Sequence, residues 1–356
     1  MCNFVGWDIG GAHLKAVQLD DKGNVLHVLQ LACPLWRGLQ ALELAMQNML
    51  QSLNILPQDA YHSVTMTGEL VDYFDNRNQG VRKIAQFVAN LLGKNVFYYA
   101  TNGNFVAYDE VKLFSAYIAS SNWHASASAI AMQVSDALLI DIGSTTTDII
   151  VIQAHKVKLN ALDICSDSAR LQNDTLVYTG VVRTPVMALA QKLFFDGREI
   201  NVMAEYFATM ADVYRLTNEL LPQYDMAETA DGKGKTKLES ARRLARMIGH
   251  DVQANEKNLQ KWLALAHTCR LLQVAQIKSA MLKQLKPNMP IIGVGAGAFL
   301  VSVIAAELNH PYLALSQVLP KTDIKNTAMM ELCFSAYAVA YLALKRQVFK
   351  QKNCTP

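Results

Sequence analysis

Hydrophobic positions along the chain follow two patterns, which predict strands and helices in alternation. Short apolar runs bounded by Gly, Asn and Asp predict strands in VGWDI, LHVLQLAC, SVTM, NVFYY and LIDI. Apolar residues at helical spacing predict helices over 38–53, 80–93 and 122–135. Strands that alternate with helices are typical of an α/β layer with parallel strand pairs.

A different pattern runs from about residue 185 to residue 287, where the spacing is mostly helical. The predicted helices lie in TPVMALAQKLFF, MAEYFATMADVYRLTNELL, SARRLARMIGH and LQKWLALAHTCRLLQVAQIKSAMLKQL. We interpret this stretch as a mostly helical insertion. The final segment, 326–348, predicts one long helix with Asn326 or Thr327 as its N-cap.

One strand–turn–strand pattern occurs twice. VGWDIGGAHLKAVQLD, from Val5 to Asp20, matches LIDIGSTTTDIIVIQA, from Leu139 to Ala154, with Asp8 aligned to Asp141 and Gly10 to Gly143. Such a repeat predicts a fold of two similar halves. We place the first half at residues 1–133 and the second at 134–356, with the insertion at about 185–287 inside the second.

Composition and charge exclude several classes of protein. The chain has 356 residues, 51% of them hydrophobic, and a formal charge of +3 without a basic stripe, so we expect about two domains and no nucleic-acid partner. Its six cysteines form no CxxC pair, which favours reduced thiols in a cytoplasm over a zinc site or a disulfide framework. The N-terminus has no signal-peptide pattern, and the longest apolar run, Ile291 to Ala306, is shorter than the ~20 residues of a membrane span. We therefore expect a cytoplasmic protein without a membrane partner.

The two glycine-containing turns are suited to bind phosphate. Backbone N–H groups in such a turn point at one spot, and a missing side chain lets an anion approach closely. Hydroxyl groups in the second turn add donors. The predicted phosphate-binding residues of the two turns are Gly10, Gly11, Gly143, Ser144, Thr145 and Thr146. We expect Gly143 to have a positive φ.

Carboxylates beside a phosphate site require a cation, because the two anions otherwise repel each other. Mg²⁺ takes oxygen ligands and is commonly held by one or two carboxylates together with substrate phosphates. The predicted metal ligands are Asp8, Asp141 and Asp148. We therefore expect Mg²⁺ as cofactor and a phosphorylated small molecule as substrate.

A third glycine-rich element, GVGAGAF from Gly293 to Phe299, predicts a strand-to-helix turn. Gly295 and Gly297 would let a phosphate or a flat ring approach. A close packing turn explains the same glycines equally well. In this order, the two hairpins and the late turn resemble the phosphate and adenosine motifs of the actin, Hsp70 and sugar-kinase superfamily. The resemblance implies duplicated actin-like ATPase (ribonuclease H-like) domains with a central cleft, and it leaves ATP open as a ligand.

Further motifs resemble the hydantoinase/oxoprolinase-related family of the tetrahydromethanopterin-linked one-carbon pathway. They are DIGGAHLK, MTGEL, NWHASA, LIDIGSTTTDI, DVYRLTNEL and TADG. The resemblance implies biosynthesis of methanofuran or methylofuran, in which an aminomethylfuran-methyl diphosphate condenses with a tyramine-derived phenol and diphosphate is released. His13 stands where many relatives are expected to have Asn, so the role of that position is open.

The family motifs also imply roles for single residues. Glu69 and His124 are the candidates for the general base, and Asp148 is included among the catalytic residues. Lys15 and Asp231 are predicted to contact substrate or phosphate.

Simpler explanations stay open for these residues and for the function. Glu69 fits a solvated loop, His124 a core histidine, Lys15 a strand edge and Asp231 a turn. The alternative functions are an ATP-dependent small-molecule kinase, a hydantoinase/oxoprolinase-like hydrolase component, and a non-enzymatic nucleotide-switched module. A homo-oligomer is compatible with the sequence.

Overall fold

The computed structural model describes residues 3–159, 167–253, 259–319 and 327–346. Its contacts divide the chain into two compact units. The first unit comprises Met1–Ala137, Ile150–Arg170 and Leu313–Pro356, and the second comprises Leu138–Ile149 and Leu171–Tyr312. The division into repeated halves at 1–133 and 134–356 stays a prediction. Packing groups the chain differently, because the described residues after Tyr312 belong to the first unit.

The first unit is built on a six-stranded mixed sheet. Its order is β3 (Val25–Ala32), β2 (His13–Leu19), β1 (Asn3–Ile9), β4 (Ala60–Met66), β5 (Val96–Tyr99) and β6 (Phe105–Ala107). Strand β4 pairs in parallel with both β1 and β5, whereas β1–β2, β2–β3 and β5–β6 are antiparallel. The parallel strands are buried on both faces, as continuous apolar runs predict.

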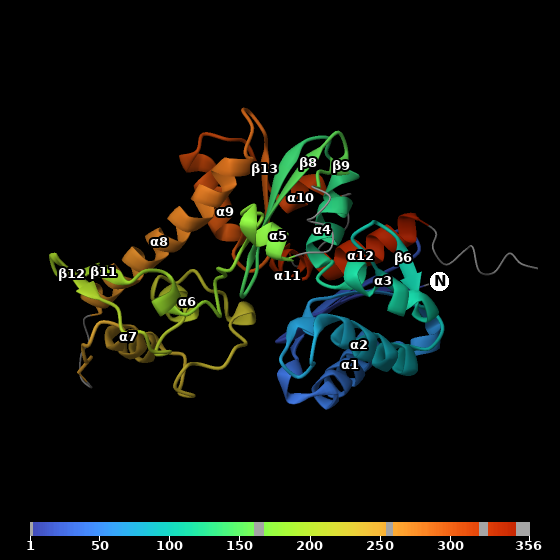
Figure 1. The fold of residues 1–356 in the computed structure, drawn as a ribbon, viewed down its shortest axis with the longest axis horizontal. Coiled ribbons are helices and arrows are strands. Elements are labelled where there is room, and N and C mark those ends of the chain that lie inside the picture. Colours follow the sequence, from blue (N-terminus) through green and yellow to red (C-terminus); the bar gives the residue numbers. More distant parts are fainter. Residues whose placement is uncertain (1–2, 160–166, 254–258, 320–326, 347–356) are drawn as a thin grey trace, which may run out of the picture. The chain divides into compact units, whose positions relative to one another are not determined.

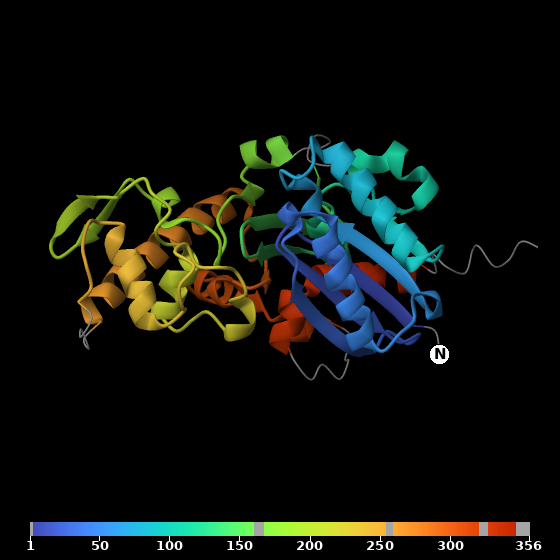
Figure 2. The same ribbon diagram turned by 90° about the horizontal axis from the view of Figure 1, so that it is seen from below.

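Helices cover both faces of this sheet (Figures 1 and 2). The alternating residues Val5, Trp7 and Ile9 of β1 share one core with the buried faces of α1 (Leu39–Leu53) and α2 (Arg77–Leu92). On the other face, α12 (Phe334–Lys345) lies against β1 and beside α4 (Asn122–Ala131). Gly6 makes this close approach feasible, because a Cβ there would be 1.9 Å from the Ala336 carbonyl oxygen.

A second sheet repeats the strand order of the first sheet. Its order is β10 (Leu176–Val177), β8 (Thr147–Gln153), β7 (Ala137–Ile142), β13 (Ile291–Val294) and β14 (Tyr312–Leu313). Strand β13 is parallel to β7, as β4 is parallel to β1, and β9 (Lys156–Val157) pairs with β8. The predicted α/β class with two similar sheets is therefore confirmed.

The stretch 185–287 is mostly helical, with one correction. Helices α6 (Met210–Leu216) and α7 (Lys237–Arg246) pack on the long helix α8 (Gln260–Gln284) (Figure 1). The helix predicted in TPVMALAQKLFF is wrong, because Lys192–Phe195 is strand β11, paired with β12 (Arg198–Asn201). Asp196 and Gly197 both have positive φ, at 50° and 78°, so an Asp-Gly hairpin turn decides the structure here.

Two further helix predictions need correction. The helix predicted from Met203 onwards begins only at Met210, where Thr209 and Asp212 form a capping box. The single C-terminal helix is broken at Cys333 into α11 (Thr327–Leu332) and α12. Asn326, one of the two predicted N-caps, lies outside the described residues. Among the helices that the structure describes, none is both long and apolar enough to span a membrane.

Candidate functional site

The two repeated hairpins close in the same way, each within its own unit. The Gly10 N–H donates to the His13 carbonyl at 2.9 Å, and the Gly143 N–H donates to the Thr146 carbonyl at 2.8 Å. The alignment of Gly10 with Gly143 is therefore structural. The expected positive φ at Gly143 is wrong, because Gly143 is not among the left-handed glycines, and a Cβ there would meet its nearest atom at an ordinary 3.5 Å.

Asp8 stands at the end of β1 in the first unit, with its carboxylate almost fully buried. The Ser335 hydroxyl of α12 donates to Asp8 Oδ2 at 2.5 Å, and Lys15 Nζ lies 3.5 Å from the same oxygen. Asp8 Oδ1 is buried without a hydrogen-bond partner. A buried carboxylate oxygen in this state fits a cation or a cation-bound water, so the residues present are compatible with the predicted Mg²⁺.

Glu69 follows β4 in a short 3₁₀ turn beside the first hairpin. The preceding Thr67 N–H donates to the Ile9 carbonyl at 2.9 Å, which ties the turn to the end of β1. Glu69 is 1% exposed, accepts a hydrogen bond from Ser120 Oγ at 2.8 Å, and has one oxygen, Oε2, without a partner. Burial raises the pKa of Glu69 to about 7, although Arg77 opposes the shift. The suggestion of a solvated loop carboxylate is therefore wrong.

His124 is buried in the interior of the first unit. Its Nδ1 is 2.9 Å from the Tyr99 hydroxyl, and its ring contacts those of Tyr99 and Trp123. Burial lowers the pKa of His124 to about 4, with further lowering from Arg346 and Arg170. A histidine that is neutral and weakly basic at pH 7 is a poorer general base than Glu69, so the physical argument favours Glu69.

In the second unit, a following loop encloses the β7–β8 hairpin. The N–H groups of Val181 and Val182 donate to the carbonyls of Gly143 and Ser144, each at 3.1 Å. Gly180 presses on the hairpin, since a Cβ there would be 2.5 Å from backbone atoms of Ser144 and Thr145. Ser144 Oγ is buried without a hydrogen-bond partner, so its capacity to donate a hydrogen bond is unused in the structure.

The residues along this hairpin differ in how deeply they are buried. The half-buried residues are Asp141, Gly143, Ser144, Thr145 and Thr146. Thr147 is fully buried and donates to the Thr179 carbonyl at 2.7 Å, which gives it a structural role. Asp148 is 7% exposed and pairs in register with Leu176 of β10.

The late glycine turn lies directly against Asp141. The predicted strand–turn–helix is confirmed, with β13 before the turn and α9 (Ala298–Glu307) after it. Gly295 has φ +84°, and a Cβ there would be 2.5 Å from Asp141 Oδ1 and 2.4 Å from the Ile142 carbonyl oxygen. The Gly297 N–H donates to the same carbonyl at 2.8 Å. The structure thus brings Gly295, Gly297 and Asp141 together.

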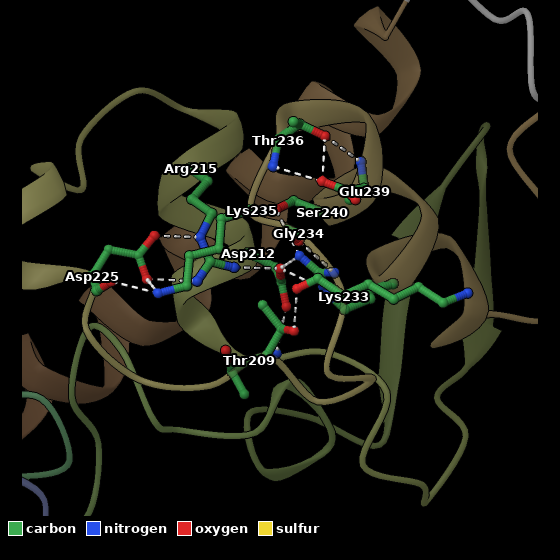
Figure 3. Close-up of polar contacts among 12 residues, drawn as sticks. Thr209, Asp212, Arg215, Asp225, Lys233, Gly234, Lys235, Thr236, Glu239 and Ser240 are labelled. Atoms are coloured by element: carbon green, nitrogen blue, oxygen red, sulfur yellow. Dashed lines mark hydrogen bonds and ion pairs between the residues drawn. The ribbon is translucent and has the colours of Figure 1, made fainter.

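A network of ion pairs around Asp212, Arg215 and Asp225 fixes the loop before α7 (Figure 3). Asp231 joins this network through Arg243. Its Oδ1 accepts a hydrogen bond from Arg243 at 3.0 Å, and Arg243 also donates to Asp212 at 2.8 Å. Asp212 binds Arg215 as well, and Arg215 forms two 2.6 Å hydrogen bonds with Asp225. The predicted substrate contact of Asp231 stays a prediction, while its described partners are structural.

Several residues around the predicted site were missed from the sequence. Ser335, Ser120 and Arg77 surround the two carboxylates of the first unit, and Gly180 supports the second hairpin. Only the glycine had a detectable signal, as a single Gly between two apolar stretches. In the described parts of the chain, no three His, Cys, Asp or Glu side chains cluster closely enough to hold a metal by themselves. A magnesium site completed by substrate phosphates does not need such a cluster.

Similarity to known proteins now adds to this geometry. The profile of the family described as Hydantoinase/oxoprolinase matches residues 60–320. A relative from Methanocaldococcus jannaschii, named (4-{4-[2-(gamma-L-glutamylamino)ethyl]phenoxymethyl}furan-2-yl)methanamine synthase, is 34% identical over 249 residues, which is 70% of this chain and 72% of the relative. A protein of the same name from Methanococcus vannielii is 36% identical over 115 residues, covering 32% of this chain and 50% of the relative.

The fold is also found among solved structures. A nucleotide-free structure of acetone carboxylase, titled for ATP-dependent acetone carboxylation, matches with a TM-score of 0.58 at 10% identity, over 94% of this chain and 69% of that one. The repeated sheet order and this match confirm the actin-like ATPase (ribonuclease H-like) fold. The protein is an enzyme, as its named relatives are. It belongs to the hydantoinase/oxoprolinase family.

Proposed function

We propose that this enzyme joins a furfuryl-type diphosphate to a tyramine-derived phenol in the biosynthesis of a methanofuran-type cofactor. The observation that carries the proposal is the 34% identity, over 70% of the chain, to a synthase whose name describes a phenoxymethyl-furan linkage. That linkage is an ether between a phenol oxygen and the methylene carbon attached to a furan ring.

The proposed reaction breaks one bond and forms one. The phenol oxygen attacks the methylene carbon of the aminomethylfuran-methyl diphosphate, the bond from that carbon to the bridging oxygen breaks, and diphosphate leaves with the electron pair. The phenolic proton goes to a base. The sum is one ether and one diphosphate from two substrates.

The leaving diphosphate gains negative charge as the bond breaks, and donors must offset that charge. The groups proposed to hold phosphate oxygens are the Ser144 hydroxyl and turn N–H groups other than those of Gly10 and Gly143, which already bond the carbonyls of His13 and Thr146. The predicted Mg²⁺ ligands stay proposals for each unit by itself: Asp8 in the first unit, and Asp141 and Asp148 in the second. When bound, Mg²⁺ would supply charge neutralisation of the diphosphate.

Glu69 is the proposed base. Its burial holds the pKa at about 7, so a substantial share of Glu69 is ionised at neutral pH and able to accept a proton. A phenol has an ordinary pKa of about 10, so the proton moves as the new bond forms and not before. His124, with its pKa near 4, is neutral at this pH and is the weaker candidate.

The proposal is tested by incubating the purified protein with the synthetic furfuryl diphosphate, γ-glutamyltyramine and Mg²⁺, and quantifying ether by mass spectrometry and diphosphate by enzymatic assay. We expect equal amounts of both products, without added ATP. Parallel calorimetric titrations compare Mg²⁺·diphosphate with Mg²⁺·ATP. Formation of no ether, together with tight ATP binding and slow ATP hydrolysis, would replace this proposal with an ATP-dependent kinase or hydrolase component.

A further inference from the structure

Arg77 contacts three polar groups from three separate segments of the first unit. It is the first residue of α2, and its Nη2 atom donates to Ser120 Oγ at 2.9 Å. The same nitrogen lies 3.5 Å from Glu69 Oε1 and 3.2 Å from Asp167 Oδ2, on the short helix α5 (Asp167–Gln172). One guanidinium therefore lies between a fully buried carboxylate and a partly exposed one.

The surroundings of Glu69 are built to hold it in one position. Gly80 of α2 faces the Glu69 backbone so closely that a Cβ there would be 2.7 to 2.9 Å from Glu69 atoms. Ser120, which donates to Glu69 and accepts from Arg77, has φ +48°. A serine held in the left-handed region costs conformational energy, and such strain is concentrated at functional sites.

Two buried atoms of this cluster have no hydrogen-bond partner. They are Glu69 Oε2 and Arg77 Nε. A carboxylate oxygen with no partner is the atom that can accept a proton from a bound molecule, while Oε1 is occupied by Ser120 and Arg77. The cluster thus fixes one oxygen of Glu69 and leaves the other without a hydrogen bond.

We propose that Arg77 is a positioning residue for Glu69. It holds the Glu69 carboxylate through Ser120, and its positive charge counteracts the negative charge of Asp167. The inference rests on the proposed function, in which Glu69 accepts the phenolic proton. Arg77 itself touches no reacting atom in this scheme.

The described charged and polar groups around Glu69 determine what each substitution does. Desolvation raises the pKa of Glu69 to about 7, the positive charge of Arg77 and the Ser120 hydrogen bond lower it, and the negative charge of Asp167 raises it. Removing Arg77 must therefore raise the pKa of Glu69, and removing Asp167 must lower it. The opposite directions follow from the opposite charges of Arg77 and Asp167, and a matching displacement of the pH–rate profile, which a merely structural cluster would not cause, links them to the reaction.

The experiment measures the titration of Glu69 directly by infrared spectroscopy, with the Glu69→Gln spectrum subtracted so that only this carboxyl remains. In Arg77→Met we expect the Glu69 midpoint to rise by about one pH unit or more. In Asp167→Asn we expect it to fall. Arg77→Lys keeps the charge, so its midpoint should lie nearer to that of the wild type.

Arg82→Met is the matched control, since Arg82 is exposed on the same helix and its Nε donates to the nearby Asn78 carbonyl at 3.1 Å. It should leave the Glu69 midpoint unchanged. The acidic limb of the condensation rate against pH should move with the midpoint in each variant. If Arg77→Met fails to fold, as judged by circular dichroism, the direction of the Glu69 midpoint shift in Asp167→Asn still tests the inference.

An unshifted Glu69 midpoint in folded Arg77→Met, or equal shifts in Arg77→Met and Asp167→Asn, overturns the inference. If the Glu69 midpoint shifts as expected in the variants but the wild-type protein forms no ether, the positioning of Glu69 is supported and the proposed function is refuted. The spectroscopic result therefore separates the two failures.

Discussion

Ser335 donates a hydrogen bond to Asp8 across 327 positions of the chain, with its hydroxyl 2.5 Å from Asp8 Oδ2. Helix α12 brings Ser335 back to the first sheet, next to the close contact at Gly6. The bond occupies one oxygen of Asp8 and leaves Oδ1 without a partner. The orientation of this carboxylate is thus fixed by the last helix that the structure describes.

Replacing Ser335 with alanine should weaken both stability and activity. The substitution removes a donor from a buried charged acceptor, which costs about 2 kcal/mol of unfolding free energy. Urea denaturation measures the change, and turnover should fall because Asp8 loses its orientation. Ser302→Ala, which removes a bond within a single helix turn, should cost less than about 0.5 kcal/mol. Equal costs for both variants would contradict the role of Ser335.

Asp141→Asn should lower turnover by about 100-fold or more while the fold stays intact. Asp141 is half-buried at the end of β7, so an isosteric amide fits, but the charge proposed to hold Mg²⁺ is lost. Steady-state kinetics and thermal unfolding check the two parts. Asp136→Asn, an exposed aspartate just before the same strand, is the control and should keep wild-type turnover. Wild-type turnover in Asp141→Asn would refute the metal role.

Two glycines of the second unit should respond differently to alanine. Gly295→Ala should destabilise the protein by about 2 kcal/mol or more, because its φ is +84° and the Cβ would lie 2.4 Å from the Ile142 carbonyl oxygen. Gly143→Ala should leave stability unchanged or raise it by up to ~1 kcal/mol, because its Cβ has room.

The same pair separates folding from binding. If the Gly143 turn binds phosphate, Gly143→Ala should weaken diphosphate binding in calorimetry although the protein is stable. A stable Gly143→Ala variant with unchanged diphosphate affinity would show that this turn is not a phosphate site.

Glu69→Gln should change the pH dependence of stability. The pKa of Glu69 is raised from 4.5 to about 7 by burial, so the folded state binds the proton more tightly than the unfolded state. The stability from this proton is fully present below pH 4.5 and is lost as pH rises through about 7. Glu69→Gln should therefore resemble the wild type at pH 4.5 and exceed it by about 3 kcal/mol at pH 8.

Urea denaturation at the two pH values measures this difference. Glu228→Gln, a change outside the Glu69 cluster, should show no such gain at high pH. A Glu69→Gln variant that is less stable than the wild type at pH 8 would contradict the raised pKa.

The sequence pattern was sufficient for the repeated hairpins and for the late glycine turn. Asp-Ile-Gly between apolar strands appears in both halves, and the two turns close with equivalent hydrogen bonds at Gly10 and Gly143. Local signals of this kind work because a strand–turn–strand unit depends on neighbouring residues.

Other features depended on contacts that are remote in sequence. Ser335 reaches Asp8 only because α12 packs on β1, and Arg77 meets Asp167 across 90 positions of the chain. The β11–β12 hairpin had a local signal, Asp196-Gly197, that the helical spacing of the flanking residues outweighed. The burial of Glu69 could not be predicted, because MTGEL contains an ordinary polar turn pattern.

In the proposed reaction the phenol oxygen attacks carbon and diphosphate leaves, and oxygen isotopes distinguish this course from transfer of phosphorus to the phenol. The enzyme is given γ-glutamyltyramine labelled with ¹⁸O in its phenol, together with the furfuryl diphosphate and Mg²⁺, and the products are weighed by mass spectrometry. Attack at carbon predicts that the label is found in the aryl ether and that the released diphosphate contains none. Label in an aryl phosphate with furfuryl monophosphate as the other product, or in an aryl diphosphate with furfuryl alcohol as the other product, would show phosphorus transfer to the phenol and refute attack at carbon.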